Sequence, residues 1–194
     1  KDEQRLRTFY TALYHTMIAP SIFNDHNRDY RGTDKKEYSR APFTNLTTFS
    51  LWDTYRAAHP LFTITQPQRV NDMVNSMLAI YQQQGKLPVW HLMGNETNTM
   101  PGNSAIPVIA DAYIKGLRGY DIEKLYEALI HGANNAGPMT AVGRAGVEYY
   151  NSLGYVPYDV NINENAARTL EYAYDDFAIY QLGRALKKPK EETD

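Results

Sequence analysis

Two dense stretches of aromatic and polar residues are the strongest candidates for chemistry in this sequence. In the first, residues 49–56, an indole, a carboxylate, a phenol and a guanidinium crowd together between Trp52 and Arg56. The second, residues 90–97, contains Asn95 and Glu96. A flat aromatic face can lie under a sugar ring, while carboxylates and amides fix the hydroxyl groups of the sugar. Together the two stretches indicate a sugar-binding pocket.

Trp52, Asp53 and Arg56 are the predicted substrate-binding residues of the first stretch. The carboxylate of Asp53 can accept hydrogen bonds from sugar hydroxyls, and its charge strengthens them. The alternative is that Asp53 caps a helix and Trp52 belongs to the core. Arg56 follows Asp53 by about one helical turn, so we expect Arg56 to orient Asp53 through an ion pair.

Asn95 and Glu96 are the predicted substrate-binding residues of the second stretch, in a loop that begins at Gly94. Glu96 could contact a sugar, or it could form structural hydrogen bonds within the loop. A carboxylic acid is also the chemical group of a general acid. We predict contact with substrate for both residues.

A polar, turn-rich loop at residues 24–32 raises the question of a metal site. Asp25, His26, Asn27 and Asp29 carry atoms that can bind a cation. Their spacing differs from that of an EF-hand, which needs a glycine in mid-loop and a terminal glutamate. We therefore interpret them as solvated turn residues, and the position of any metal ligands stays unknown.

Three further titratable residues are expected to be structural. His59 is interpreted as an ordinary histidine at the end of a helix rather than a ligand. Asp175 and Asp176 lie in a long helical stretch, and we expect them on a solvated face or as capping partners of a neighbouring loop.

The composition excludes several classes of function. The 194 residues suffice for one domain with a core. With 20 basic and 22 acidic residues the net charge is −2, so no basic stripe for nucleic acid is expected. No apolar run approaches the roughly 20 residues that cross a bilayer. There is no cysteine for a disulfide or a thiolate metal site. The 16 tyrosines suit carbohydrate contacts, or equally packing between helices.

Helical periodicity dominates the chain, and we find no convincing strand alternation, so the predicted class is all-α. The expected helices cover residues 3–17, 52–58, 67–84, 104–116, 121–133, the second half of 137–150, and 163–188. We expect His59-Pro60 to close the second helix and the tail from Lys190 to lack order. In the last helix the predicted apolar face consists of Leu170, Ala173, Tyr174, Phe177 and Leu182. Long loops between about six helices favour part of an (α/α)6 toroid over a four-helix bundle.

Several consecutive words along the chain resemble glycoside hydrolase family 92. These are Phe-Tyr-Thr-Ala-Leu-Tyr-His at 9–15, Phe-Ser-Leu-Trp-Asp-Thr-Tyr-Arg-Ala-Ala-His-Pro-Leu at 49–61, Gly-Asn-Glu-Thr-Asn-Thr-Met at 94–100 and Leu-Glu-Tyr-Ala-Tyr-Asp-Asp at 170–176. The resemblance runs from Phe9 to Ala185. It implies an exo-acting, calcium-dependent, inverting α-mannosidase, similar to α-1,2-mannosidases, that removes terminal mannose from glycans. It also places Trp52 and Asp53 in the subsite for the terminal mannose.

The sequence departs from the pattern of this family at the catalytic residues. The Glu-Gly-Asn or Glu-Ala-Asn word of the general acid is missing, and so is the Gly-Asn-Asp-Asp word of the base. We therefore assign no catalytic residue to this chain. We expect residues 1–194 to be a partial catalytic (α/α)6 domain, with an N-terminal β-sandwich before it and the catalytic half and the Ca²⁺ ligands outside it. Residues 1–194 alone are expected to be inactive.

Further expectations concern location and partners. The chain has no signal peptide and opens in charged, helix-like sequence, which indicates a cut within a larger protein. The family implies a bacterial enzyme of the periplasm, cell surface or extracellular space. An incomplete toroid leaves apolar helix faces uncovered, so we expect self-association. The alternatives are a non-catalytic helical module that binds glycans or a protein, and an (α/α)6 glycosidase of another sugar preference.

Overall fold

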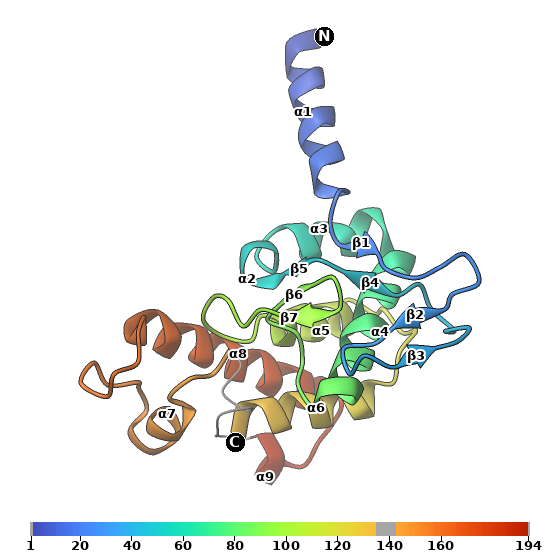
Figure 1. Ribbon diagram of the computed structural model, residues 1–194. Helices are drawn as coiled ribbons and strands as arrows, with labels where there is room; N and C mark the ends of the chain where they lie inside the picture. Colours follow the sequence, from blue (N-terminus) through green and yellow to red (C-terminus); the bar gives the residue numbers. More distant parts are fainter. Residues whose placement is uncertain (1, 135–142, 194) are drawn as a thin grey trace.

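The computed structural model describes residues 2–134 and 143–193, and this part of the chain is mostly helical. Helices α4, α5, α6 and α8 form the body, and α1 projects away from it (Figure 1). The predicted predominance of helix is confirmed, and short antiparallel strands, which the all-α class did not include, occur between the helices. Among the described residues, no helix combines the length and apolarity needed to cross a membrane.

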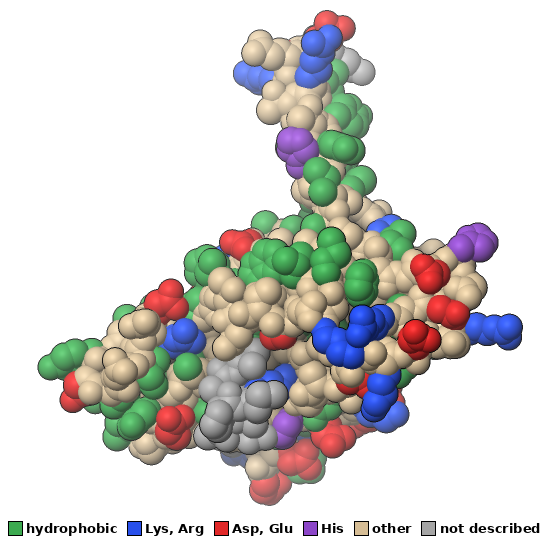
Figure 2. All heavy atoms as spheres, viewed as in Figure 1, with side chains coloured by type: hydrophobic (Ala, Val, Ile, Leu, Met, Phe, Trp, Pro, Cys, Tyr) green, Lys and Arg blue, Asp and Glu red, His purple; other side chains and the backbone are tan. Residues whose placement is uncertain are grey.

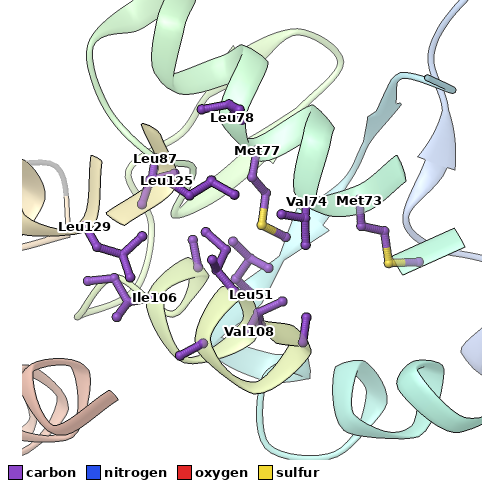
Figure 3. Close-up of a cluster of buried hydrophobic side chains, with 14 of the residues drawn as sticks. Leu51, Met73, Val74, Met77, Leu78, Leu87, Ile106, Val108, Leu125 and Leu129 are labelled. Carbon is purple, nitrogen blue, oxygen red and sulfur yellow. The ribbon is translucent and has the colours of Figure 1, made fainter. Parts of the chain in front are cut away.

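The hydrophobic core lies where α4 (Pro67–Gln84), α5 (Ala105–Ile114) and α6 (Ile122–Asn134) meet (Figure 3). Proline is tolerated in the first turn of α4, where its missing N–H needs no partner. Gly85 ends α4 in the left-handed region at φ 76°, which glycine adopts without strain. Asp121 starts α6 by accepting the backbone N–H of Lys124 at 3.1 Å. The three helices match their predicted ranges closely.

Helix α1 (Glu3–Thr16) is capped by Asp2, whose carboxylate accepts the N–H groups of Gln4 and Arg5. None of its residues is buried. Hydrophobic side chains line one side of this projecting helix (Figure 2). The predicted helix is confirmed, but its apolar stripe packs on no core within the described residues.

The long helix α8 (Asn165–Ala185) packs against α5 and α6, and it corrects a prediction. Leu170, Tyr174 and Phe177 of the predicted apolar face are 72%, 46% and 54% exposed. The buried side instead contains Tyr172 and Asp175. Leu182 of the predicted face is buried as expected, whereas the rest of that face was predicted wrongly. Hydrophobicity alone did not mark Tyr172 and Asp175 as members of the packed face.

The described part of the chain contains seven short strands, and all of them pair antiparallel. The first four form the pairs β1 (Ser21–Ile22) with β4 (Leu46–Thr47) and β2 (Tyr30–Arg31) with β3 (Glu37–Tyr38). The others form one sheet in the order β5 (Phe49–Ser50), β6 (Trp90–Leu92), β7 (Asn95–Glu96). Strands of two or three residues are too short to produce a visible alternation, which explains why the sequence did not predict them.

Four short helices complete the fold: α2 (Leu51–Thr54), α3 (Ala58–Thr65), α7 (Val147–Leu153) and α9 (Lys190–Thr193). The prediction that His59-Pro60 closes a helix was wrong, since both residues lie in the first turn of α3, where proline is tolerated. The tail from Lys190 was expected to lack order but is helical to Thr193. The helix expected in the second half of 137–150 corresponds to α7, which begins at Val147 and continues to Leu153. Residues 137–142 lie outside the described part of the chain.

Candidate functional site

The β5–β6–β7 sheet brings the two chemistry-bearing stretches side by side. Ser50 pairs with Trp90, Phe49 pairs with His91, and His91 pairs with Glu96 on the next strand. Helix α2 begins directly after β5, so Trp52 and Asp53 lie two and three residues beyond the sheet. The first and second stretches therefore belong to one region of the surface.

Trp52 and Asp53 both reach the surface of this region. Asp53 is exposed, and its carboxylate accepts a hydrogen bond from the hydroxyl group of Ser50, the residue before α2. Trp52 is partly buried rather than part of the core. Asp53 thus contacts the start of its helix and still presents its carboxylate to solvent, which keeps it available to a ligand.

Arg56 lies across two aromatic rings. Its guanidinium carbon is 4.5 Å from the centre of the Tyr55 ring and 5.1 Å from that of Trp52, within cation–π range. Its Nη2 forms an ion pair of 2.7 Å with Oε1 of Glu171 on α8. The expected ion pair with Asp53 is therefore wrong. Glu171 is far away in the sequence, and no local pattern pointed to it.

Glu171 also accepts a hydrogen bond of 3.0 Å from the Tyr55 hydroxyl at its second oxygen, Oε2. Burial, and after it this hydrogen bond, raises the pKa of Tyr55. The Tyr174 ring lies 5.6 Å from the Tyr55 ring, centre to centre. We call Trp52, Asp53, Tyr55, Arg56 and Glu171 the indole wall. It joins α2 to α8, and sequence reasoning found only three of its five members.

Glu96 and Asn95 hold the β6–β7 turn. The Glu96 carboxylate accepts the backbone N–H groups of Val89 and Trp90 at 2.9 Å and of Asn98 at 2.8 Å. The Asn95 side chain accepts a hydrogen bond from the Lys35 ammonium and donates one to the Met93 carbonyl at 3.0 Å. These contacts favour the structural interpretation of Glu96. Contact with substrate stays a prediction for both residues.

A second cluster of charges lies beside the wall, and two of its three side chains are buried. Arg144 forms ion pairs with Asp176 at 2.7 Å and with Asp175 at 3.7 Å, and Asp175 accepts the Asn103 N–H at 2.9 Å. The Arg144 and Asp175 side chains are each 1% exposed. A solvated face was the wrong interpretation for Asp175, whereas its contact with the loop at Asn103 was expected. Burial raises the pKa of Asp175 to about 7 although Arg144 favours its charged form.

Comparison with known proteins decides the family. All of residues 1–194 match the model described as "Glycosyl hydrolase family 92 catalytic domain". The chain belongs to glycoside hydrolase family 92.

Solved structures of family 92 members share the fold. A family 92 α-mannosidase from Bacteroides thetaiotaomicron is 42% identical, with a TM-score of 0.89 over 96% of this chain and 24% of its own. A second structure of that enzyme is a complex with mannoimidazole. A family 92 inverting mannosidase from the same organism is 36% identical, with a TM-score of 0.89 over 98% of this chain and 26% of its own.

A curated relative from Arthroderma benhamiae, named an uncharacterized secreted glycosidase, is 30% identical over 96% of this chain and 21% of its own length. The chain thus spans about a quarter or less of the length of these relatives. The fold of the chain therefore matches one part of these larger family 92 proteins.

The calcium that family 92 implies finds no matching site among the described residues. They contain no group of three acidic or histidine side chains that could hold a metal ion. In the loop at 24–32, Asp29 is already used: Oδ1 accepts the Arg40 N–H at 2.8 Å and Oδ2 accepts the Asn27 amide at 2.7 Å. These residues do not fit a calcium site.

Proposed function

We propose that this chain supplies part of the substrate pocket of an exo-acting α-mannosidase. Support comes from the match of the whole chain to the family 92 catalytic domain, together with the likeness to two solved family 92 mannosidases. The observation that carries the assignment of residues is the indole wall, in which an exposed carboxylate, Asp53, adjoins a partly buried indole, Trp52.

The wall has the chemistry that a terminal mannose requires. The Asp53 carboxylate has two oxygens, so it can accept hydrogen bonds from two neighbouring hydroxyl groups. The Trp52 ring offers an apolar face to the C–H groups of the sugar. Arg56 adds N–H donors, and Asn95 and Glu96 of the adjacent sheet complete the proposed contact surface.

Bond cleavage would use groups outside residues 1–194. An inverting glycosidase needs a carboxylic acid that protonates the leaving oxygen and a carboxylate that activates water, roughly 6.5–9.5 Å apart. The larger protein would supply both, along with its calcium. We propose α-1,2-linked mannose on N-glycans as substrate, and the periplasm, cell surface or extracellular space as location. The name of the secreted fungal relative is consistent with export.

The decisive experiment substitutes Asp53 in the complete enzyme. With α-1,2-mannobiose as substrate, Asp53→Asn should lower kcat/KM about 100-fold, because two charge-assisted hydrogen bonds are lost. Asp111→Asn is the matched control, since it removes an exposed pair with Lys115 on α5. An unchanged kcat/KM in Asp53→Asn would refute the assignment of the wall.

A second measurement tests whether the catalytic acid and base lie outside residues 1–194. Residues 1–194 alone should show no turnover of α-1,2-mannobiose with calcium present. Turnover near that of the complete enzyme would mean that the acid and base lie within this chain.

A further inference from the structure

Glu171 is the residue of the indole wall that helix α8 contributes, and it contacts two other members of the wall. One carboxylate oxygen pairs with Nη2 of Arg56 at 2.7 Å, and the other accepts the Tyr55 hydroxyl at 3.0 Å. The Glu171 side chain is only 12% exposed, whereas that of Arg56 is 50% exposed. The buried partner is therefore the acid, and the partner that reaches solvent is the guanidinium.

The position of Glu171 is itself fixed by close packing. Gly102, at φ 82°, lies so near that a Cβ atom there would be 2.9 Å from Cβ of Glu171. One turn further along α8, Asp175 accepts the N–H of Asn103, the residue after Gly102. This segment packs closely against the face of α8 that carries Glu171, which fixes the base of the side chain.

Arg56, in contrast, depends on its contacts for its orientation. A long arginine side chain that is half exposed samples many rotamers unless hydrogen bonds restrain it. Its Nη1 donates to the Trp52 carbonyl at 3.2 Å, and its Nη2 donates to Glu171. Without the Glu171 carboxylate, the guanidinium would lose the charged contact that fixes it across the two rings. The buried Tyr55 hydroxyl would also lose its acceptor.

We propose that Glu171 is a positioning residue for sugar binding: from α8 it holds the Arg56 guanidinium across Trp52 and Tyr55 so that the remaining N–H groups meet the sugar. This inference rests on the proposed function of the wall. It adds a residue that touches no sugar and acts through its neighbour. The ordinary alternative is an ion pair that contributes only to stability.

A double-mutant cycle in the complete enzyme separates positioning from stability. The probe is mannoimidazole, and its Kd is measured by calorimetry. Glu171→Gln preserves the size of the side chain and should raise the Kd about tenfold, as expected for one lost charged hydrogen bond. In the Arg56→Gln background, Glu171→Gln should change the Kd less than about twofold, because the guanidinium that Glu171 positions is absent. Glu164→Gln, which removes the ion pair between Glu164, exposed at the start of α8, and Arg168, should leave the Kd unchanged.

Two results would overturn the inference: an unchanged Kd in Glu171→Gln, or the same tenfold loss in both backgrounds. The second would assign Glu171 a purely structural role. If Glu171→Gln does not fold, Tyr55→Phe replaces it in the cycle, because it removes one hydrogen-bond donor to Glu171. Tyr55→Phe should then raise the Kd several-fold, and this rise should disappear in the Arg56→Gln background. Failure of the proposed function is distinct, because then Asp53→Asn as well as Arg56→Gln would bind mannoimidazole like the unchanged enzyme.

Discussion

The guanidinium of Arg144 lies 3.7 Å from the carboxylate of Asp175, and each of these side chains is only 1% exposed. Arg144 also pairs with Asp176 and lies over the Tyr172 ring, with its guanidinium carbon 5.1 Å from the ring centre. A buried charge without a partner is strongly destabilising. The two aspartates of α8 thus anchor the segment at Arg144 beside the helix that also carries Glu171.

Replacement of Asp175 should change how stability depends on pH. Burial raises the pKa of Asp175 to about 7, whereas the unfolded chain titrates near 3.8. Between these values the folded state binds one more proton than the unfolded state. The free energy of unfolding should therefore fall as pH rises through this window. From pH 5 to pH 7 the loss relative to Asp175→Asn should be about 2–3 kcal/mol.

Urea unfolding of both proteins at several pH values, followed by tryptophan fluorescence, measures this difference. Asp111→Asn is the control, because its exposed pair with Lys115 should give a nearly constant offset in that range. If the free energy of unfolding depends on pH in the same way in the unchanged protein and in Asp175→Asn, the pKa of Asp175 is not raised by folding.

Local patterns predicted the central helices well, for reasons visible in the structure. In α4 the apolar residues recur at helical spacing, and Gly85 ends the helix in a left-handed conformation. In α5 an apolar stretch predicted burial on most sides, and seven residues from Ala105 to Ala112 are indeed buried. The family words predicted the membership of the chain, because several of them follow one another in order along most of its length.

Contacts across long sequence distances were beyond local patterns. The partner of Arg56 is Glu171 on another helix, whereas one-turn spacing pointed to Asp53. Nothing in the local sequence predicted that Arg144 is buried, since an arginine next to a glycine is typical of an exposed turn. The buried side of α8 was misjudged because Asp175 contacts Arg144 and Asn103 rather than solvent.

Replacement of Glu96 distinguishes a structural role from a catalytic one. Its carboxylate accepts three backbone N–H groups, and Glu96→Gln turns one of the acceptor atoms into a donor. We expect the free energy of unfolding to fall by about 1–3 kcal/mol. In the complete enzyme at a temperature where the variant is folded, kcat on α-1,2-mannobiose should stay within about threefold, since loss of a general acid or base typically costs about 100-fold or more. Glu37→Gln on exposed strand β3 is the control, and a 100-fold loss of kcat in Glu96→Gln would contradict the structural role.

Two buried histidines should make the protein sensitive to acid. His59 and His91 are each 3% exposed, and burial lowers the pKa of both to about 4. Between pH 6.5 and pH 4 the unfolded state binds more protons, so stability should fall as the pH falls, by up to about 3 kcal/mol per histidine. The raised pKa of Asp175 makes its contribution to stability increase as the pH falls, opposite to that of the histidines. The histidines are therefore tested in the Asp175→Asn variant.

Adding His59→Gln to Asp175→Asn should reduce the acid-induced loss by roughly half, measured by urea unfolding at pH 7, 5.5 and 4. His26→Gln is the matched control, because His26 is exposed in the loop at 24–32 and should leave the acid slope unchanged. An identical acid slope with and without His59 would contradict its burial as a neutral ring.

The projecting helix α1 should drive association of residues 1–194. Phe9 and Tyr10 are 59% and 62% exposed on a helix that has no buried residue. Covering such side chains removes apolar surface from water, which favours a contact between copies of the chain. Sedimentation velocity should show association that increases with concentration, and Phe9→Ser with Tyr10→Ser should weaken it about tenfold or more. Thr8→Ser on the same helix should leave it unchanged, whereas a monomer at every concentration would rule out this role for α1.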